Sequence, residues 1–524
     1  MPHRRSRRTH RFARRFVSRL GGCLALLLAG AACDGDPEGM RFPELGPHDG
    51  LSPLVERVGL AHALPWGEEG AARTERARQL ALLRGLGVRH ARMDFTWHAL
   101  ETKAGEWDFR ALDAVVEDVA RAGVSLLGVA AYGNPAYPSA SGSEPGTQLP
   151  LDAPPEVYFP PVDPAHYARY VATIAKRYAG RVPAYELWNE ENIGFRFWRP
   201  KADAGAYARQ TLAAARAGRA ACPSCLFLLG GLSMPQPYPK LELYPPGPGY
   251  LGELYRAVPE LNEALDAVAY HPYQYPKDPP EFETAAWPEK PQGSLATQTR
   301  QIAERVKSQR RAIPLWITEN GWPTNPKVPE TDEEVARIFG LELSLVKLAR
   351  GFLGDPQFRK LVETIRGVSE QDQARYLVRS VLIGLVSGVH RAYLYTLLDF
   401  PVEPEINQEA AFGLFRPNGA EKPSARALRT LLTRFGSYRF VGEVTEALLL
   451  GADDRAVAFR DGNRLLLAFW RWKGAAGSVT LRLLPGQPTL YDLEGRALAA
   501  GGTPASVKVP LGPDVVWLEI TPPL

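Results

Sequence analysis

Strand-like and helix-like segments alternate through most of the chain, and this alternation limits the folds that the chain can adopt. Short apolar segments that read as buried strands lie at 57–63, 88–95, 124–132, 182–188, 226–231, 265–271, 313–319 and 392–398. Helix-like segments follow many of them, at 70–86, 108–122, 164–178, 203–220, 373–387 and 422–435. Such alternation is typical of βα units and a parallel sheet. Eight strands in this pattern predict a closed (β/α)8 barrel, an α/β fold, rather than an open sheet.

The pattern changes near residue 436, where short strand-like segments with turn residues between them replace the βα units. They lie at 438–444, 456–459, 464–470, 478–484, 489–493 and 515–520, and Asp461-Gly462 is typical of a hairpin turn. We therefore expect a barrel domain over 51–435 and a small C-terminal antiparallel β-sandwich over 436–524. For the sandwich we favour a structural role over the alternative of sugar binding.

Residues 1–33 are predicted to be an export signal. Eight arginines and no acidic residue precede an apolar run at 20–32 that is too short for a stable membrane span. Small residues directly before Cys33 resemble a bacterial lipoprotein cleavage site, which would attach the mature chain to a membrane through a lipidated Cys33. The alternative is simple cleavage and release. We expect an exported protein, either a cell-envelope lipoprotein or a secreted one, with a tether at 34–50.

The positive formal charge of the chain belongs to this leader. The full chain carries +4, and subtracting the eight leader arginines leaves −4. A nucleic-acid partner is therefore not expected. Outside the leader only Cys222 and Cys225 remain, and in an exported protein we interpret them as a small structural disulfide. A redox pair or half of a zinc site are the alternatives, but neither a second cysteine pair nor a nearby histidine cluster completes them.

Polar side chains follow two of the predicted strands at the point where each strand ends. Asn189 and Glu190 come after the strand at 182–188, and Glu319 ends the strand at 313–319. Because the carboxyl ends of all barrel strands meet at one rim, two glutamates there would lie above the same hollow. Glycoside hydrolysis is the commonest chemistry of such a carboxylate pair.

At these residues the chain resembles the retaining clan A glycoside hydrolases, most closely family 39 and family 5-like proteins. The motifs are Trp-Asn-Glu at 188–190 and Thr-Glu-Asn-Gly at 318–321. The resemblance implies Glu190 as the acid/base, Glu319 as the nucleophile and Asn189 as a substrate-binding residue. It also implies a carbohydrate substrate and no metal or organic cofactor.

Further segments extend the resemblance over roughly residues 54–435: VRHARMDFTWHALETKAGEWDFRALD, AYHPY and FGLFRPNGAEKPSARAL. By this likeness Arg92 would stand near the nucleophile and help to keep it ionised. His271 and Tyr273 would orient Glu319 or the sugar bound at the cleavage point. Trp322 and Tyr132 lie on rim loops, where their rings would stack on a sugar face or, as an alternative, pack within the loops.

Two departures from the family pattern stand out. Glu191 occupies a position that is usually proline, and its carboxylate would either help Glu190 to keep a proton or point into solvent; we favour solvent. The eighth strand, AYLYTLLDF, lacks the tryptophan that many clan members place beneath the sugar. Tyr393 or Tyr395 would then shape that part of the site.

These observations predict a retaining β-glycosidase that acts on an oligo- or polysaccharide. Two alternatives remain open, a transglycosylase that uses the same glutamates and a non-catalytic surface protein that binds glycans. No oligomeric state is predicted.

Overall fold

The computed structural model describes residues 52–139, 155–194, 196–234, 245–274, 278–281, 285–286, 290–291, 293–324, 330–339, 343–363, 367–400, 408–482, 487–499, 501–503 and 506–521. The predicted leader, Cys33 and the tether at 34–50 lie outside these residues. The described residues form two compact units, one over Val55–Ala425 and the other over Arg426–Leu524 together with residues 52–54.

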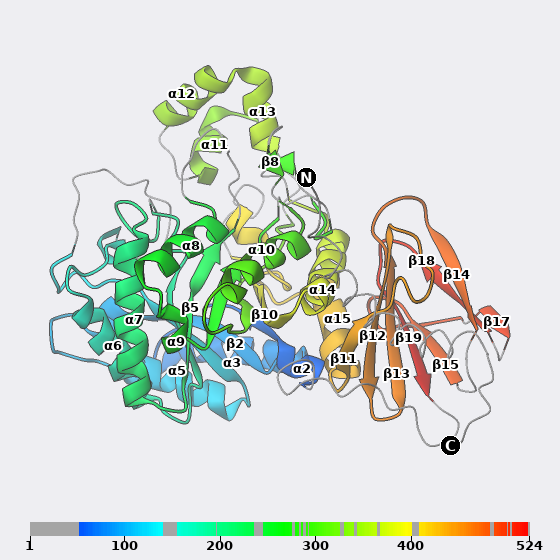
Figure 1. Ribbon diagram of the computed structural model, residues 1–524, viewed down its shortest axis with the longest axis horizontal. Coiled ribbons are helices and arrows are strands. Elements are labelled where there is room, and N and C mark those ends of the chain that lie inside the picture. Colours follow the sequence, from blue (N-terminus) through cyan, green and yellow to red (C-terminus); the bar gives the residue numbers. More distant parts are fainter. Residues whose placement is uncertain are drawn as a thin grey trace, which may run out of the picture. The chain divides into compact units, whose positions relative to one another are not determined.

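The larger unit is a closed barrel of eight parallel strands (Figure 1). The strands are β1 (Val58–Ala61), β2 (His90–Thr96), β3 (Ser125–Ala131), β4 (Ala184–Asn189), β5 (Leu226–Ser233), β6 (Ala267–His271), β9 (Leu315–Ile317) and β10 (Val389–Tyr395). Strand β1 pairs with both β2 and β10, which closes the ring. Two strands of two residues each, β7 (Ala285–Ala286) and β8 (Lys290–Pro291), follow β6 and pair antiparallel. The predicted barrel is confirmed.

Helices surround the barrel strands (Figure 1). They are α2 (Leu54–Arg57), α3 (Gly70–Gly85), α4 (Trp97–Leu100), α5 (Arg110–Arg121), η1 (Pro155–Tyr158), α6 (Pro164–Arg177), α7 (Ala204–Ala221), α8 (Gly247–Ala257), α9 (Leu261–Ala264), α10 (Leu295–Lys307), α14 (Glu370–Val386), η2 (Gln408–Ala411) and α15 (Pro423–Arg429). None of the helices in the described ranges is both long and apolar enough to cross a membrane.

Local sequence explains where several of these helices begin. The side chain of Asp163 accepts a hydrogen bond from the backbone N–H of Ala165, and Pro164 occupies the first helical position of α6. Asp203 caps α7 in the same way through the N–H of Ala206. In α5 the buried residues follow the helical repeat, at positions Leu112, Val115, Val116 and Val119.

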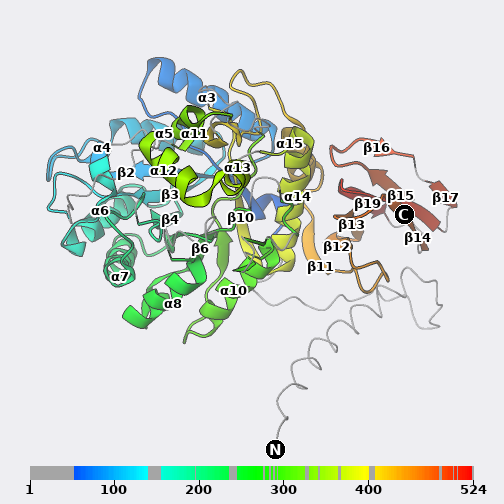
Figure 2. The same ribbon diagram turned by 90° about the horizontal axis from the view of Figure 1, so that it is seen from above.

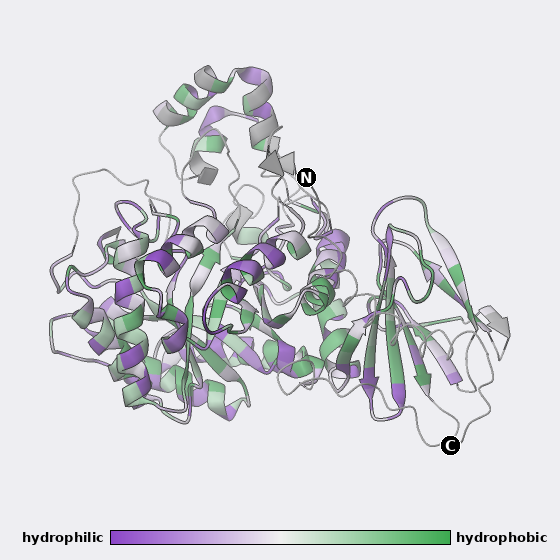
Figure 3. Cartoon of the chain, viewed as in Figure 1, coloured by the Kyte–Doolittle hydropathy of each residue, from purple (hydrophilic) through white to green (hydrophobic). Residues whose placement is uncertain are grey.

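The barrel interior is filled by side chains of unequal size from different strands. Small and medium residues (Ala61, Leu127, Ala184, Leu228 and Ala267) pack with Trp316 and Tyr393 in one buried cluster. The Tyr393 ring lies against Gly59, where a Cβ atom would stand 2.6 Å from a ring carbon. The predicted role of Tyr393 beneath a sugar is therefore replaced by a core role, since the ring is fully buried inside the barrel. Figure 3 shows the barrel strands coloured mainly as hydrophobic.

A helical insertion follows β9 and consists of α11 (Asp332–Phe339), α12 (Leu343–Leu353) and α13 (Asp355–Glu363). These helices have a small core of their own, formed by Val335, Ala336, Val346, Phe358 and Val362. Figures 1 and 2 both show the three helices over one end of the barrel. Because the insertion follows a strand, this is the end at which the polar strand termini gather.

The smaller unit is a β-sandwich of a six-stranded and a three-stranded antiparallel sheet. The first sheet has the order β11 (Arg439–Glu443), β12 (Asp454–Asp461), β13 (Arg464–Arg471), β19 (Val516–Thr521), β15 (Gln487–Tyr491) and β16 (Ala497–Leu498). The second contains β14 (Gly477–Arg482), β18 (Ser506–Leu511) and β17 (Gly501–Thr503). A π-helical segment, η3 (Thr430–Arg434), precedes them. The predicted sandwich is confirmed.

Sequence reasoning missed strands β16, β17 and β18. The first two have only two and three residues, too short for a detectable alternation. Pro510 hid β18, since proline argues against a central strand. The pairing of β18 with β17 ends at Lys508. Pro510, which has no backbone N–H, therefore needs no hydrogen bond to β17.

The contact between α7 and β5 gives a test of barrel packing. A Cβ atom on Gly218 would stand 2.5 Å from a ring carbon of Phe227. We expect Gly218→Ala to destabilise the protein by about 1–3 kcal/mol through overpacking. As a control, Gly205→Ala in the same helix would meet the end of the Arg209 side chain at 3.2 Å and Asp203 Oδ1 at 3.5 Å, and it should leave stability unchanged or slightly raised. Denaturant unfolding of both variants checks this; equal stabilities would contradict the packing argument.

Candidate active site

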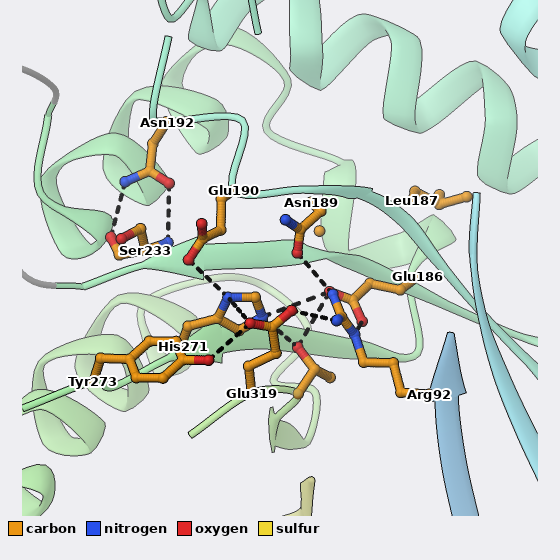
Figure 4. Close-up of polar contacts among 12 residues, drawn as sticks. Arg92, Glu186, Leu187, Asn189, Glu190, Asn192, Ser233, His271, Tyr273 and Glu319 are labelled. Carbon is orange, nitrogen blue, oxygen red and sulfur yellow. Dashed lines mark hydrogen bonds and ion pairs between the residues drawn. The ribbon is translucent and has the colours of Figure 1, made fainter. Parts of the chain in front are cut away.

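The two glutamates singled out from the sequence lie at the same end of the barrel and contact the same histidine (Figure 4). Glu190 Oε1 is 2.9 Å from His271 Nδ1, and Glu319 Oε2 is 3.9 Å from the same nitrogen. Their side chains are 11% and 16% exposed, so both carboxylates are largely desolvated but reachable. Glu190 follows β4 and Glu319 follows β9, two strands that are not neighbours in the ring.

Arg92 of β2 joins the polar groups at the centre of this site. Its Nη1 donates to Glu319 Oε1 at 2.5 Å, and its Nη2 donates to Asn189 Oδ1 at 2.7 Å. Its Nε and Nη2 also donate to the two oxygens of Glu186, at 2.7 and 3.1 Å. The guanidinium is thus buried and held by three side chains, and it fixes the position of the Glu319 carboxylate.

His271 connects the two glutamate-bearing strand ends. Besides its bond to Glu190, its Nε2 lies 3.0 Å from Thr318 Oγ1, and Thr318 donates to Glu186 Oε1 at 3.1 Å. Tyr273 completes the set, since its hydroxyl donates to Glu319 Oε2 at 2.9 Å. A continuous hydrogen-bonded network therefore links both glutamates, and it keeps their carboxylates in fixed orientations.

The charges of this network favour an ionised Glu319. Burial alone would raise the pKa of Glu319, but positive charge on His271 and Arg92 and hydrogen bonds from Tyr273 and Arg92 bring it below its ordinary value. For His271, burial alone would lower the pKa, but Glu319 and Glu190 outweigh burial and raise it. Protonation of His271 and ionisation of Glu319 thus favour each other.

The backbone at the end of β4 is strained. Trp188 and Glu190 have positive φ values of 81° and 47°, which residues with a side chain rarely adopt. Neighbouring contacts hold this conformation: the Trp188 indole N–H donates to the carbonyl of Phe197, and the N–H of Glu190 donates to the carbonyl of Gly231. Such strain commonly persists where surrounding structure overrides it, often at functional sites.

Two glycines of β5 make room for the network. A Cβ atom on Gly231 would overlap His271 Nε2 and lie 2.8 Å from Glu186 Oε1. A Cβ atom on Gly230 would lie 2.7 Å from Glu191 Oε2. The pairing of β5 with β6 shifts register between Leu229 and Leu232, at these glycines. Close approach of His271 to the network therefore requires glycine at 231.

Sequence reasoning missed three members of the site, Asp94, Glu186 and Thr318. Asp94 lies two residues after Arg92 and so faces the same side of β2, with its side chain only partly buried. Glu186 is fully buried in the middle of an apolar strand. Glu186 could have been found as a lone charge within an apolar strand. Asp94 could have been found as a polar residue two positions from the predicted site residue Arg92.

The predicted aromatic residues differ in their positions. Tyr132 is buried beside Asp94, and its ring stacks on Phe197. Trp322 is not part of the network: it is fully buried, its indole N–H donates to the carbonyl of Asp278, and its ring packs edge-on against Tyr376. This position agrees with the alternative stated for Trp322, packing within the loops. A role of Trp322 in substrate binding stays a prediction.

The interpretation of Glu191 as a solvent-facing residue is wrong. Its side chain is completely buried, and neither carboxylate oxygen has a hydrogen-bond partner among the described residues. Burial, together with the nearby charges of Glu186 and Glu190, raises the pKa of Glu191 well above its ordinary value. The chain turns inward after Glu190 because Asn192 is tied to the backbone of Ser233 and Pro245.

The cysteine pair forms the predicted disulfide, Cys222–Cys225, at the end of α7. Within the described residues, no group of three or more histidine, cysteine, aspartate or glutamate side chains could hold a metal ion.

Comparison with solved structures shows which proteins share this architecture. The barrel and sandwich match a family 39 glycoside hydrolase from Bacteroides cellulosilyticus WH2, with a TM-score of 0.60, 18% identity, and coverage of 90% of this chain and 82% of that one. The likeness shows that this chain shares the fold of that protein, a barrel of eight parallel strands and an antiparallel β-sandwich. The family 39 enzyme from Xanthomonas axonopodis pv. citri matches this fold with a TM-score of 0.56, 16% identity, and coverage of 90% and 96%.

A monomeric β-xylosidase from Caulobacter crescentus CB15 has the same fold, with a TM-score of 0.56, 16% identity, and coverage of 91% of this chain and 99% of that one. No protein-family model matches the sequence, and no curated protein does. The resemblance proposed from the motifs is thus confirmed at the level of the fold.

The unpartnered Glu191 gives a test that needs no substrate. The folded protein keeps a proton on Glu191 that the unfolded chain releases above about pH 4.5, so rising pH lowers the free energy of unfolding of the wild type. Glu191→Gln removes this loss. We expect the two proteins to be about equally stable near pH 4, and the variant to become the more stable of the two as the pH rises from 4 to 7.

Denaturant unfolding across this pH range measures the difference. Glu304→Gln, at an exposed position of α10, is the matched control and should show no such trend. A stability difference for Glu191→Gln that does not grow with pH would contradict a neutral buried acid.

Proposed function

We propose that the protein is a retaining β-glycosidase that cleaves O-glycosidic bonds of an oligo- or polysaccharide. Glu319 attacks the anomeric carbon while Glu190 gives its proton to the leaving oxygen, which forms a covalent glycosyl-enzyme and releases the first product. Glu190 then takes a proton from water, and the oxygen of that water displaces Glu319 from the anomeric carbon. Two displacements restore the original anomeric configuration.

The observation that carries the proposal is the shared contact of the two carboxylates with His271. Their oxygens cannot be farther apart than the sum of 2.9 Å and 3.9 Å. Retaining enzymes hold their carboxyl groups about 5–5.5 Å apart and inverting enzymes about 6.5–9.5 Å. This upper bound on one pair of oxygens is compatible with the retaining distance.

The electrostatics support the same assignment of roles. A nucleophile must be ionised, and the pKa of Glu319 lies below its ordinary value because His271 and Arg92 outweigh the effect of burial. Arg92 donates to Glu319, Glu186 and Asn189, and none of these bonds reaches Glu190. Asn189, fixed by Arg92, is positioned to bind a sugar hydroxyl. The matching folds include proteins described as a β-xylosidase and a glucosidase, which also favours carbohydrate chemistry.

We propose in addition that the enzyme acts outside the cytoplasm. The support is the arginine-rich and then apolar segment at 1–33, which ends at Cys33. Lipidation of Cys33 would attach the mature protein to a membrane; cleavage without lipidation would release it.

Removal of the nucleophile tests the function. We expect Glu319→Ala to lower kcat by at least about a thousandfold on any substrate found with a panel of aryl β-glycosides and polysaccharides. Azide should restore turnover by occupying the space of the lost carboxylate, giving a glycosyl azide of inverted configuration. Glu304→Ala, on the outer face of α10, is the control and should keep full activity. Full activity of Glu319→Ala would contradict the proposal, and products transferred to added sugars would identify a transglycosylase.

The pH dependence tests the network around the nucleophile. Loss of the positive charge in His271→Asn should raise the pKa of Glu319 and move the acidic limb of the kcat/KM profile upward by about one pH unit. Thr318→Val, which removes the hydroxyl that contacts His271 Nε2 and Glu186 but leaves the imidazole in place, should shift the limb less. If the acidic limb of the profile does not move in His271→Asn, His271 does not control the ionisation of Glu319.

A further inference from the structure

Lys422 and Asp399 form a buried ion pair for which the proposed mechanism has no use. The Nζ atom of Lys422 lies 2.8 Å from Asp399 Oδ1, and the two side chains are only 1% and 8% exposed. In the barrel unit, Asp399 follows β10 and Lys422 directly precedes α15. Replacing a buried ion pair by apolar residues often leaves stability unchanged, so stability alone does not explain such a pair.

The pair binds the backbone on both sides of one residue, Phe412. Lys422 Nζ donates to the carbonyl of Ala411 at 3.4 Å. The N–H of Gly413 donates to Asp399 Oδ1 at 2.8 Å. A Cβ atom on Gly413 would stand 2.0 Å from the backbone nitrogen of Asp399, so the two segments lie in close contact. The backbone of Phe412 is therefore held in place from both sides.

The side chain of Phe412 packs against residues around Glu319. Phe412 is only 5% exposed, and its ring lies edge-on to the ring of Tyr273, with centroids 5.9 Å apart and an interplanar angle of 78°. It contacts the ring of Tyr395 in the same way, at 5.4 Å and 65°. A Cβ atom on Gly321, two residues after Glu319, would stand 3.0 Å from a carbon of the Phe412 ring. Phe412 thus fills the space between the ends of β6, β9 and β10.

Tyr273 connects this packing to the proposed nucleophile. Its hydroxyl donates to Glu319 Oε2 at 2.9 Å (Figure 4). A hydrogen bond to an ionised carboxylate lowers the pKa of that carboxylate, and the bond weakens steeply when its direction changes. The hydroxyl stands at the far end of the Tyr273 ring, so a rotation of this ring would direct the O–H away from Glu319. Contact with Phe412 opposes such a rotation.

We propose that the ion pair of Lys422 and Asp399 keeps the Phe412 ring against Tyr273, and thereby keeps the Tyr273 hydroxyl directed at Glu319. The inference rests on the proposed glycosidase function. Lys422, Asp399 and Phe412 are then positioning residues, which influence the reaction through Tyr273 and do not themselves exchange protons or bonds with the substrate.

The ionisation of Glu319 reports on this arrangement. Titratable and charged side chains from three strands and their ends surround its carboxylate: Arg92, Asp94, Glu190, His271 and Tyr273. Phe412 packs against one of them, Tyr273. A change at Phe412 should therefore raise the pKa of Glu319 no farther than complete loss of the Tyr273 hydrogen bond does.

The acidic limb of the kcat/KM profile measures this effect. We expect Tyr273→Phe to move the limb upward by about one pH unit, because ionised Glu319 loses a donor. Phe412→Leu should move the limb in the same direction by about half a pH unit, since it keeps the hydroxyl but leaves the Tyr273 ring free to turn. In the Tyr273→Phe background, Phe412→Leu should cause no further shift, because it acts through the missing hydroxyl.

Phe109→Leu is the matched control. Phe109 is 9% exposed and also packs edge-on against a tyrosine, Tyr178, with centroids 6.3 Å apart and an interplanar angle of 79°. Both residues lie at the ends of outer helices, Phe109 directly before α5 and Tyr178 directly after α6. Phe109→Leu should lower the free energy of unfolding and leave the acidic limb in place.

The ion pair is tested by a double variant, Lys422→Met with Asp399→Asn. It removes both charges at nearly constant volume, so that no buried charge is left unpaired, and it removes the contact of Lys422 with Ala411. The acidic limb should move in the same direction as in Phe412→Leu. Phe412→Leu keeps both charges, so it decides the inference even if the double variant does not fold.

Three results overturn the inference alone: an acidic limb that does not move in Phe412→Leu, an equal shift by Phe412→Leu in the Tyr273→Phe background, or an unmoved limb in the folded double variant. Turnover by the wild type on the panel of aryl β-glycosides and polysaccharides is measured first. Its absence overturns the glycosidase function, and the inference with it.

Discussion

The site depends on one buried cation, the guanidinium of Arg92. Burying an arginine is unfavourable unless its charge is compensated and its donors are bonded. Glu186, Glu319 and Asn189 provide this compensation from two other parts of the barrel. Since β2 is adjacent to neither β4 nor β9 in the ring, the contacts of Arg92 cross the barrel interior. The same interactions that make burial of Arg92 tolerable thus position the groups proposed to react.

The side chains that surround Arg92 pack closely, and two glycines, Gly230 and Gly231, leave the space that this packing needs. His271 reaches both glutamates only because residue 231 has no side chain. The register shift in β5 at this point and the positive φ values of Trp188 and Glu190 show that regular strand geometry ends where the polar network begins. The apolar cluster inside the barrel is closely packed and therefore rigid. Such a rigid support can hold the strained backbone of Trp188 and Glu190 in place.

Much of the fold and the central pair of the site could be predicted from the sequence. The alternation of apolar strands and amphipathic helices was sufficient for the barrel, because each element must bury one face. Asn189, Glu190 and Glu319 were recognisable since polar residues ended apolar strands. Glu186 and Thr318 were not recognised, because their importance comes from contacts between strands distant in sequence. The short strands of the sandwich escaped because two or three residues carry no periodicity.

The sequence by itself determined the order of strands and helices, the presence of acids at two strand ends and the proximity of those ends on a single rim. It did so because the period of apolar residues is a local property of the chain. Tertiary structure alone decided that Glu191 turns inward and that Trp322 and Tyr393 pack in the core. These outcomes depend on register, on the space left by Gly230 and Gly231, and on which charges meet across the barrel, and none of these is encoded in a local pattern.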